Sequence, residues 1–244
     1  MSKAKVLVVR APGTNCDCET ADSFRHLGAA AQAVVIGDIV SGKTAFSDFD
    51  IAAFPGGFSY GDYIAAGRIH AAALDKVRGE LERFIKSGRP VIGICNGFQI
   101  LVKAGLLPFA GGQSASFTFN DNGRFTARWV RLKVNPKSRC LFTQNLPAEI
   151  DLPIAHGEGK FVTRSAAVLS EIRAGHCAAL QYVENPNGAQ DDIAGLCNPE
   201  GNCFGLMPHP ERFAFPFQHP GWRKNRSSRA DGMDILANAV RYVN

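Results

Sequence analysis

Residues 90–101 of this 244-residue chain read PVIGICNGFQIL, an apolar run that ends in Gly-x-Cys-x-Gly and continues as a helix-like pattern. A strand, a tight turn and a helix in this order form a nucleophile elbow, which pushes one side chain out of the backbone. Gly93 and Gly97 are the small residues that such a crowded turn needs. The following helix directs its positive end at Cys95, which favours the nucleophilic thiolate. The stretch predicts Cys95 as a nucleophile, and a buried structural cysteine is the alternative.

A base for this nucleophile is available near the other end of the chain. Residues 203–212 read CFGLMPHPER, so a strand-like run delivers His209 at its end and Glu211 follows two residues later. A nucleophilic cysteine requires a base within hydrogen-bond reach and a third group that orients the base. His-Pro-Glu alone is typical of a plain loop. Together with the elbow, it predicts a catalytic triad of Cys95, His209 and Glu211.

A third segment supplies candidate backbone donors. Residues 51–62 read IAAFPGGFSYGD, a short apolar strand that runs into Gly56 and Gly57. Consecutive glycines allow backbone N–H groups to approach a ligand closely. Acyl transfer to cysteine places negative charge on the carbonyl oxygen, which paired N–H donors stabilise. We expect the N–H of Gly57 or Phe58 and the N–H of Asn96 to form this pair; an ordinary glycine turn is the alternative.

These segments, in this order, resemble class I glutamine amidotransferases and, more closely, the glutaminase subunits of phosphoribosylformylglycinamidine synthase. The stretches GGFSYGD at 56–62 and AHGEG at 155–159 narrow the resemblance, which spans nearly the whole chain. The resemblance implies that Cys95 attacks the side-chain amide of glutamine. It also implies that His209 acts as base and then as acid, while Glu211 orients His209.

The resemblance also implies a set of substrate-binding residues and a partner. The expected substrate-binding residues are Gly56, Gly57, Phe58, Asn96, Gln99, His156, Gly157 and Glu158. Among them, the segment 156–158 is expected to hold the α-amino and carboxylate groups of glutamine. No cofactor is expected in this chain. ATP and Mg²⁺ are expected on a partner synthase subunit that converts formylglycinamide ribonucleotide to the formylglycinamidine, and a small accessory subunit fits the same assembly.

Composition sets limits on the class of protein. Lys and Arg number 27 against 22 Asp and Glu, and this mild excess of +5 does not demand a nucleic-acid partner. No apolar run approaches the roughly 20 residues of a membrane span. The odd count of seven cysteines favours a reducing compartment, so we expect a cytoplasmic protein. No spacing of His, Cys and Asp resembles a metal site, and His209 and Glu211 lack the partners that zinc needs, so no metal is expected.

The periodicity predicts a single α/β domain over residues 1–244. Strands are expected at 5–10, 33–36, 51–54, 91–95, 129–134, 178–183, 193–197 and 203–207, and helices at 16–27, 69–87, 96–103 and 231–243. Alternating strands and helices in the first half predict a parallel, flavodoxin-like sheet covered on both faces. The second half adds antiparallel strands, including a hairpin around 198–202. We expect either Asn15 or Asp17 to cap the first helix.

Three alternative functions are compatible with these motifs. The chain could be the glutaminase subunit of another synthase, such as those for guanylate or anthranilate, although residues 58–62 argue against this. It could be a free-standing cysteine amidohydrolase, which would turn over without a partner. It could also be a catalytically silent subunit that regulates a synthase, although the intact triad argues against that role.

Overall fold

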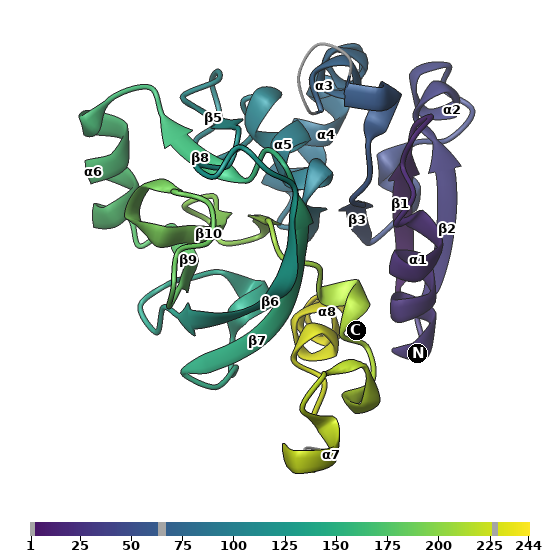
Figure 1. Cartoon of the computed structure of the whole chain (residues 1–244). Coiled ribbons are helices and arrows are strands. Elements are labelled where there is room, and N and C mark those ends of the chain that lie inside the picture. The colour runs from purple at the N-terminus through teal and green to yellow at the C-terminus, as the bar shows by residue number, and fades with distance from the viewer. Residues whose placement is uncertain (1–2, 63–66, 226–228) are drawn as a thin grey trace.

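The computed structural model describes residues 3–62, 67–225 and 229–244 of the chain. Within these ranges, nine strands form one mixed sheet in the order β2-β1-β3-β4-β11-β10-β9-β6-β7, while β5 and β8 pair separately (Figure 1). The strands are β1 (Lys5–Arg10), β2 (Ala30–Val35), β3 (Ile51–Phe54), β4 (Val91–Ile94), β5 (Ala115–Thr118), β6 (Thr126–Val134), β7 (Glu149–His156), β8 (Lys160–Thr163), β9 (Ala178–Tyr182), β10 (Ile193–Cys197) and β11 (Cys203–Leu206).

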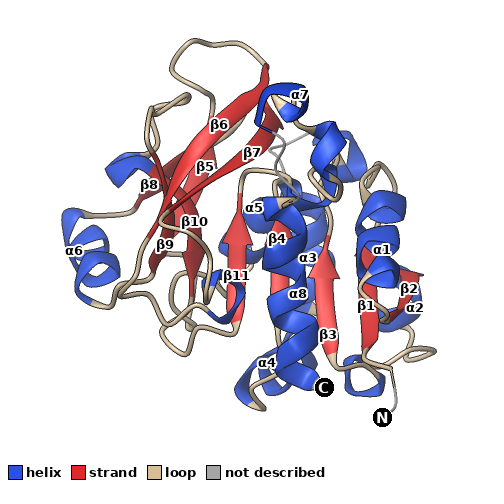
Figure 2. Ribbon diagram, turned by 90° about the horizontal axis from the view of Figure 1, so that it is seen from below, coloured by secondary structure: helices blue, strands red, loops and turns tan. Residues whose placement is uncertain are grey.

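The sheet has a parallel half and an antiparallel half, as the sequence predicted. The pairs from β2 through β1, β3 and β4 to β11 are parallel, and the pairs from β11 through β10, β9 and β6 to β7 are antiparallel. Every residue of β3 and β4 is buried, which explains their uninterrupted apolar sequences. The predicted hairpin joins β10 to β11 and returns the chain to the centre of the sheet (Figure 2).

Helices cover both faces of the parallel half. The helices among the described residues are α1 (Asp17–His26), α2 (Ile36–Val40), α3 (Arg68–Asp75), α4 (Arg78–Lys86), α5 (Asn96–Lys103), α6 (Ala166–Ala174), α7 (Trp222–Asn225) and α8 (Asp231–Val243). Helix α1 packs with α8, and α3 packs with α5, against opposite faces of the sheet (Figure 1). In the described part of the chain, every helix is too short or too polar to cross a bilayer.

Several predicted boundaries were wrong for identifiable reasons. The expected helix at 69–87 divides into α3 and α4 at Val77, whose backbone leaves the helical region. The break lets α3 pack on α5 while Phe84 of α4 packs on Phe46. Strand β7 was missed because Pro153 interrupts the pattern, although its alternate residues are buried. A proline is tolerated there because β7 is an edge strand.

The expected cap of the first helix is also absent. Helix α1 starts at Asp17 after Cys16, whose side chain makes no capping hydrogen bond. Asp17 instead forms an ion pair with Arg10 at 3.2 Å, so its carboxylate joins the end of β1 to the first turn of α1. Asn15 accepts a contact from the sulfur of Cys16 at 3.4 Å. Both polar side chains therefore organise the loop between β1 and α1.

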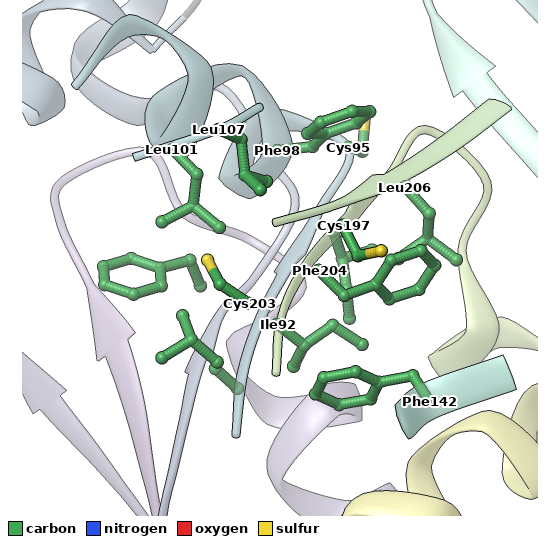
Figure 3. Packing of buried hydrophobic residues seen from close by; sticks show 14 of the residues in the cluster. Ile92, Cys95, Phe98, Leu101, Leu107, Phe142, Cys197, Cys203, Phe204 and Leu206 are labelled. Atoms are coloured by element: carbon green, nitrogen blue, oxygen red, sulfur yellow. The ribbon is translucent and has the colours of Figure 1, made fainter. Parts of the chain in front are cut away.

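Close packing between β11 and α5 sets the position of the central turn. Ile92, Phe98, Phe204 and Leu206 form part of the apolar core at this point, between the two central strands and their covering elements (Figure 3). A Cβ atom at Gly205 of β11 would overlap the ring of Phe98. The glycine therefore lets α5 approach the sheet closely, which places the N-terminus of this helix beside the ends of the central strands.

Candidate active site

The turn between β4 and α5 is a nucleophile elbow. Cys95 has φ +50° and ψ −105°, a backbone conformation that few residues other than glycine adopt. A Cβ atom at Gly93 would lie 2.7 Å from the carbonyl oxygen of Gly97, and one at Gly97 would overlap the carbonyl oxygen of Phe54. Side chains at either glycine would therefore break the turn. The N–H of Cys95 donates to the carbonyl of Leu206 at 2.7 Å, which ties the elbow to β11.

The parallel pairing of β4 with β11 brings His209 to the elbow. Leu206 is in register with Ile94, so both chains leave the sheet at the same edge. The N–H of His209 donates to the carbonyl of Pro153 in β7 at 2.8 Å. Its Nδ1 lies 2.6 Å from Oε1 of Glu211, and both side chains are buried. Nδ1 therefore faces the carboxylate, and Nε2 remains for the sulfur side of the ring.

Two cysteine sulfurs interact with this imidazole, whereas the sequence indicated one. The thiols of both Cys95 and Cys16 contribute to raising the pKa of His209. Donor atoms of Cys16, His209 and Glu211 lie within 4.8 Å of one another. A Cβ atom at Gly56 would lie 2.8 Å from Cε1 of His209, 3.2 Å from Sγ of Cys16 and 3.4 Å from Cβ of Cys95. The side chains of Cys16, Cys95 and His209 therefore all pack against the backbone of Gly56.

Cys16 is held by neighbours that the sequence did not connect with the site. Its N–H donates to the carbonyl of Gly56 at 3.2 Å. A guanidinium nitrogen of Arg212 lies 3.1 Å from its sulfur, and the same side chain pairs with Glu19 at 2.9 Å. The signal that could have identified Cys16 is its position just after the carboxyl end of the first parallel strand.

The environment of the site favours the neutral thiol of Cys16 and the charged imidazolium of His209. Burial raises the pKa of the Cys16 thiol to about 11, so this sulfur keeps its proton at neutral pH. Burial also opposes the charged form of His209, but the Glu211 carboxylate and the sulfurs of Cys95 and Cys16 outweigh it. Together they raise the pKa of His209 well above its usual value. The site is therefore built to stabilise an imidazolium.

The glycine segment supplies one backbone donor to the cleft. The N–H of Phe58 donates to the carbonyl of Gly13 at 2.9 Å, so this donor is occupied. Gly57, with φ +141°, forms an isolated bridge with Thr14 and lines the cleft. Of the two donors expected from this segment, the structure therefore leaves the N–H of Gly57 for a ligand.

A chain of amide side chains connects the glycine segment with the elbow. Oδ1 of Asn96 accepts from the hydroxyl of Ser59 at 2.6 Å, and its Nδ2 donates to Oε1 of Gln99 at 3.0 Å. Nε2 of Gln99 donates in turn to the carbonyl of Glu158 at 2.7 Å. Both polar ends of Gln99 therefore have protein partners. Through Asn96 and Glu158, Gln99 therefore connects the glycine segment, the elbow and the segment after β7, in addition to lining the cleft.

The active-site cleft has a volume of about 250 Å³, just below the usual range of about 300–1,000 Å³ for ligand sites. Its lining residues are Asn15, Cys16, Gly57, Phe58, Cys95, Gln99, Phe119, Phe125, Ala155, His156, Gly157, Glu158, His209 and Arg212. The list includes all predicted substrate-binding residues except Gly56 and Asn96, which lie behind the lining. Phe58, Phe119 and Phe125 are exposed aromatic residues of this lining. The cleft suits a substrate of amino-acid size.

His156, at the end of β7, is fixed as a neutral hydrogen-bond acceptor. Asn120 donates through Nδ2 to the carbonyls of Arg124 and His156, both at 2.9 Å, so its Oδ1 must be an acceptor. Nδ1 of His156 lies 3.1 Å from that Oδ1 and therefore carries the proton. Burial, with a smaller contribution from His209, lowers the pKa of His156 to about 4. Its Nε2, which has no partner among the described residues, presents a lone pair.

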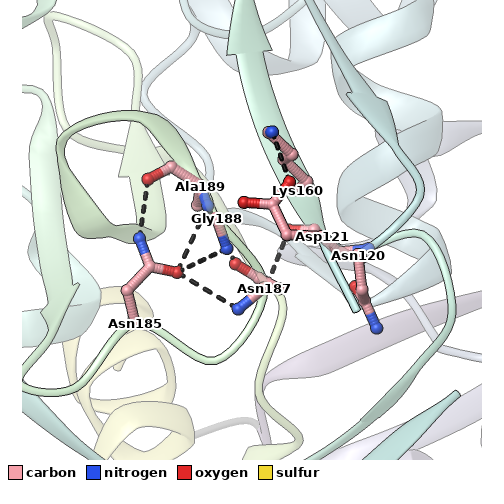
Figure 4. A network of polar contacts seen from close by, with 8 residues as sticks. Asn120, Asp121, Lys160, Asn185, Asn187, Gly188 and Ala189 are labelled. Carbon is pink, nitrogen blue, oxygen red and sulfur yellow. Dashed lines mark hydrogen bonds and ion pairs between the residues drawn. The ribbon is translucent and has the colours of Figure 1, made fainter. Parts of the chain in front are cut away.

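A polar network behind the cleft supports the segment that contains His156. The N–H of Asp121 donates to the carbonyl of Asn187 at 3.2 Å, and Lys160 pairs with the Asp121 carboxylate (Figure 4). Oδ1 of Asn185 accepts from the N–H of Gly188 at 2.8 Å (Figure 4). Asn187 donates through Nδ2 to the carbonyl of Gly159 at 2.8 Å. These contacts stabilise the turn after β7 from the side that faces away from the cleft.

Comparison with known proteins agrees with this geometry. Residues 3–243 match the family model for the CobB/CobQ-like glutamine amidotransferase domain. The chain is 43% identical over 258 residues to phosphoribosylformylglycinamidine synthase subunit PurQ of Dehalococcoides mccartyi, covering 100% of this chain and 99% of that protein. It is 39% identical over 267 residues to the subunit of the same name from Archaeoglobus fulgidus, covering 98% of this chain and 97% of the relative.

Solved structures also resemble this chain. A chain of the structure of PurLQS from Thermotoga maritima superposes with a TM-score of 0.81 and 31% identity, and the match covers 100% of both chains. A glutamine amidotransferase structure from Thermotoga maritima gives a TM-score of 0.60 at 16% identity, covering 100% of this chain and 99% of that one. The second likeness concerns the fold alone.

Proposed function

Because the chain belongs to the CobB/CobQ-like glutamine amidotransferase family and, within it, to the PurQ subunits of phosphoribosylformylglycinamidine synthase, we propose that it hydrolyses glutamine to supply that synthase with ammonia. The observation that carries the proposal is the elbow at Cys95, which shares one cleft with the buried pair His209 and Glu211. The product ammonia would serve purine biosynthesis through the partner subunit.

Cys95 is the proposed nucleophile, although Cys16 also lies beside the imidazole. Cys95 lies at the N-terminus of α5, where the helix dipole stabilises negative charge, and its strained backbone projects it from the sheet. Cys16 remains a thiol because of its raised pKa. A thiol is a poor nucleophile. The choice therefore rests on the backbone of the elbow and on the protonation of the competing sulfur.

The reaction proceeds by acyl transfer to Cys95. The thiolate attacks the side-chain carbonyl carbon of glutamine, and the resulting tetrahedral intermediate collapses to a γ-glutamyl thioester. His209 gives its proton to the departing nitrogen, which leaves as ammonia. The neutral imidazole then takes a proton from water as the water attacks the thioester, and glutamate leaves with regeneration of the thiolate–imidazolium pair. Glu211 holds the ring and balances its charge in the first state.

The oxyanion of the tetrahedral intermediate is assigned to two backbone donors. The N–H groups of Gly57 and Asn96 come from segments that the Ser59 contact to the Asn96 side chain holds together. Each such donor contributes about a hundredfold to a thousandfold in rate. The segment His156, Gly157 and Glu158 is assigned to the amino-acid end of glutamine. There, Nε2 of His156 accepts a hydrogen bond from the α-ammonium group.

The partner carries the remaining chemistry. ATP and Mg²⁺ are assigned to the synthase subunit, since the motifs of this chain include no phosphate-binding loop with lysine. The PurLQS structure from Thermotoga maritima suggests an assembly with subunits of the PurL and PurS kinds. The proposed location of the complex is the cytoplasm.

A glutaminase assay of the chain, alone and with a candidate synthase subunit, tests this function. We expect slow glutamine hydrolysis by the isolated chain and a large stimulation when the synthase subunit and its substrates are added. Full-rate hydrolysis without any partner would instead identify a free-standing amidohydrolase. A Cys95→Ala complex should still make product from added ammonia, and this activity controls for correct assembly.

A further inference from the structure

The first half of β6 has a neighbouring strand on one side only. Strand β6 pairs with β7 from Thr126 to Lys133, and the two strands lie side by side in Figure 2. On the other side, β9 pairs only with residues 132–134 of β6. Just past β9, the N–H of Val183 donates to the carbonyl of Arg131 at 2.9 Å. Among the described residues, no strand continues this pairing along residues 126–130, so this stretch is an open strand edge.

The backbone groups of Ala127 and Trp129 point toward this open edge. In an antiparallel ribbon, alternate residues direct their N–H and C=O groups to the same side. The carbonyl of Arg131 faces β9, so the backbone groups of Trp129 and Ala127 face the same way. The register with β7 agrees, because Pro153, opposite Trp129, directs its carbonyl away from β6. In the described part of the chain, no backbone group pairs with Ala127 or Trp129 on the open side.

A cavity of about 420 Å³ lies along the open edge. Its walls include Trp129 and Arg131 of β6 together with Val183 and Glu184, where the chain leaves β9. The space beside the strand is therefore not filled by side chains of the protein. An extended peptide satisfies a row of free N–H and C=O groups by adding a strand. The edge thus selects an extended segment rather than a helix.

The side chains of the edge argue against a second copy of this chain as the occupant. Arg128 is exposed and forms no ion pair with a described residue. Across a two-fold axis, antiparallel pairing that uses both Ala127 and Trp129 would place Arg128 directly opposite Arg128 of the other copy. Like charges that face each other across two strands are destabilising. A different chain, with an acidic side chain at this position, complements the edge.

The open edge adjoins the mouth of the active-site cleft. Phe125, immediately before β6, lines the cleft together with Phe58 and Phe119. These three residues are 55%, 49% and 69% exposed, respectively. Exposed aromatic side chains that gather in one place are typical of a protein interface. Ammonia that leaves this cleft for a synthase requires the synthase to cover the same side of the molecule.

We propose that an extended segment of the synthase partner adds as a strand to the open edge of β6, with an acidic side chain opposite Arg128. The identity of the partner rests on the proposed function, whereas the open edge is a property of the fold. Strand addition would fix the orientation of the synthase over the cleft mouth, because the backbone groups of Ala127 and Trp129 define one register.

Amide hydrogen exchange tests the proposal without any variant. The full chain is compared alone and in complex with a candidate synthase subunit, with single amides resolved by mass spectrometry. Exchange at Ala127 and Trp129 should slow at least about tenfold in the complex. The amides of Arg128 and Val130 face β7 and serve as the internal reference. Unchanged exchange at Ala127 and Trp129 in a complex with stimulated glutaminase activity would overturn the proposed edge and leave the proposed function standing.

A proline substitution tests the backbone contact directly. Ala127→Pro removes an N–H that no described backbone group uses, so it should weaken binding of the synthase subunit at least about tenfold in calorimetry. Ala127→Ser keeps the N–H and is the matched control, which should bind as the unmodified chain does. Arg128→Glu should also weaken binding, because it repels the proposed acidic side chain. Slow glutamine hydrolysis by each isolated variant shows that the cleft is intact.

Two further results would overturn the proposal. Full affinity of the Ala127→Pro variant for the synthase subunit would show that the edge is not used. A dimer of the unmodified chain that Ala127→Pro dissociates would assign the edge to a second copy instead. Failure of the chain to bind or to be stimulated by any synthase subunit would overturn the proposed function together with the partner named here.

Discussion

Replacing Cys95 should nearly abolish the glutaminase activity, whereas replacing Cys16 should change it little. Cys95→Ala removes the proposed nucleophile, and the neighbouring sulfur is a poor substitute because burial raises its pKa to about 11. At pH 8 a thiol with that pKa is ionised in about one molecule in a thousand. Residual activity through Cys16 should therefore not exceed about a thousandth of the unmodified rate. Cys16→Ser keeps a small polar group beside Arg212 and should change the rate by no more than a few fold.

The assay measures ammonia release from glutamine by the complex. A diazoketone analogue of glutamine, followed by peptide mass spectrometry, identifies the sulfur that forms the covalent bond. Retained synthesis from added ammonia shows that each variant is assembled. Our reasoning would be refuted if the label appeared on Cys16, or if Cys95→Ala kept more than about a hundredth of the glutaminase rate.

Three other substitutions probe the same architecture. Glu211→Gln removes the buried charge behind the catalytic imidazole and should lower kcat/KM by about a hundredfold or more; an effect under threefold in steady-state kinetics would contradict its orienting role. Gly97→Ala forces a methyl onto the carbonyl of Phe54 and should destabilise the fold by at least about 2 kcal/mol in urea unfolding, whereas Gly79→Ala, whose methyl meets only the Arg83 side chain at 3.6 Å, should not. Burial lowers the pKa of His70 from 6.5 to about 4. As the pH falls from 6.5 to about 4, the unfolded chain therefore binds this proton before the folded chain does, and the free energy of unfolding drops by at most about 3 kcal/mol. His70→Phe should remove this contribution, as measured by urea unfolding above and below this pH range.

Local patterns were sufficient for the parts of the site that lie at strand ends. The elbow at Cys95 and the glycine pair before Phe58 each follow a wholly buried strand, so their positions could be inferred from the rule that parallel strands share a carboxyl edge. The arrival of His209 depends on the pairing of β11 with β4 at the centre of the sheet, a position that the sequence did not indicate.

The missed residues depend on contacts between segments that are far apart in the sequence. Cys16 joins the cleft because Gly56 carries no side chain, a relation that only the folded chain reveals. Asn120 fixes the tautomer of His156 across 36 positions of sequence, and it lies in a turn with no regular period. The strand that carries His156 was itself hidden by Pro153. Polar convergence of this kind is set by tertiary packing rather than by local propensity.

The central placement of β11 has a consequence for the synthesis of the protein on the ribosome. Strands β2, β1, β3 and β4 emerge and can pair early, but the open flank of β4 gains its neighbour only after residue 206 has been made. Until then, the edge of β4 stays unpaired while more than one hundred further residues are synthesised. An unpaired apolar strand edge is a surface to which other chains can add strands. The reactive sulfur also remains without its base throughout this interval. A nascent chain is therefore both inert toward glutamine and in need of shielding, and both conditions end with the insertion of the same strand.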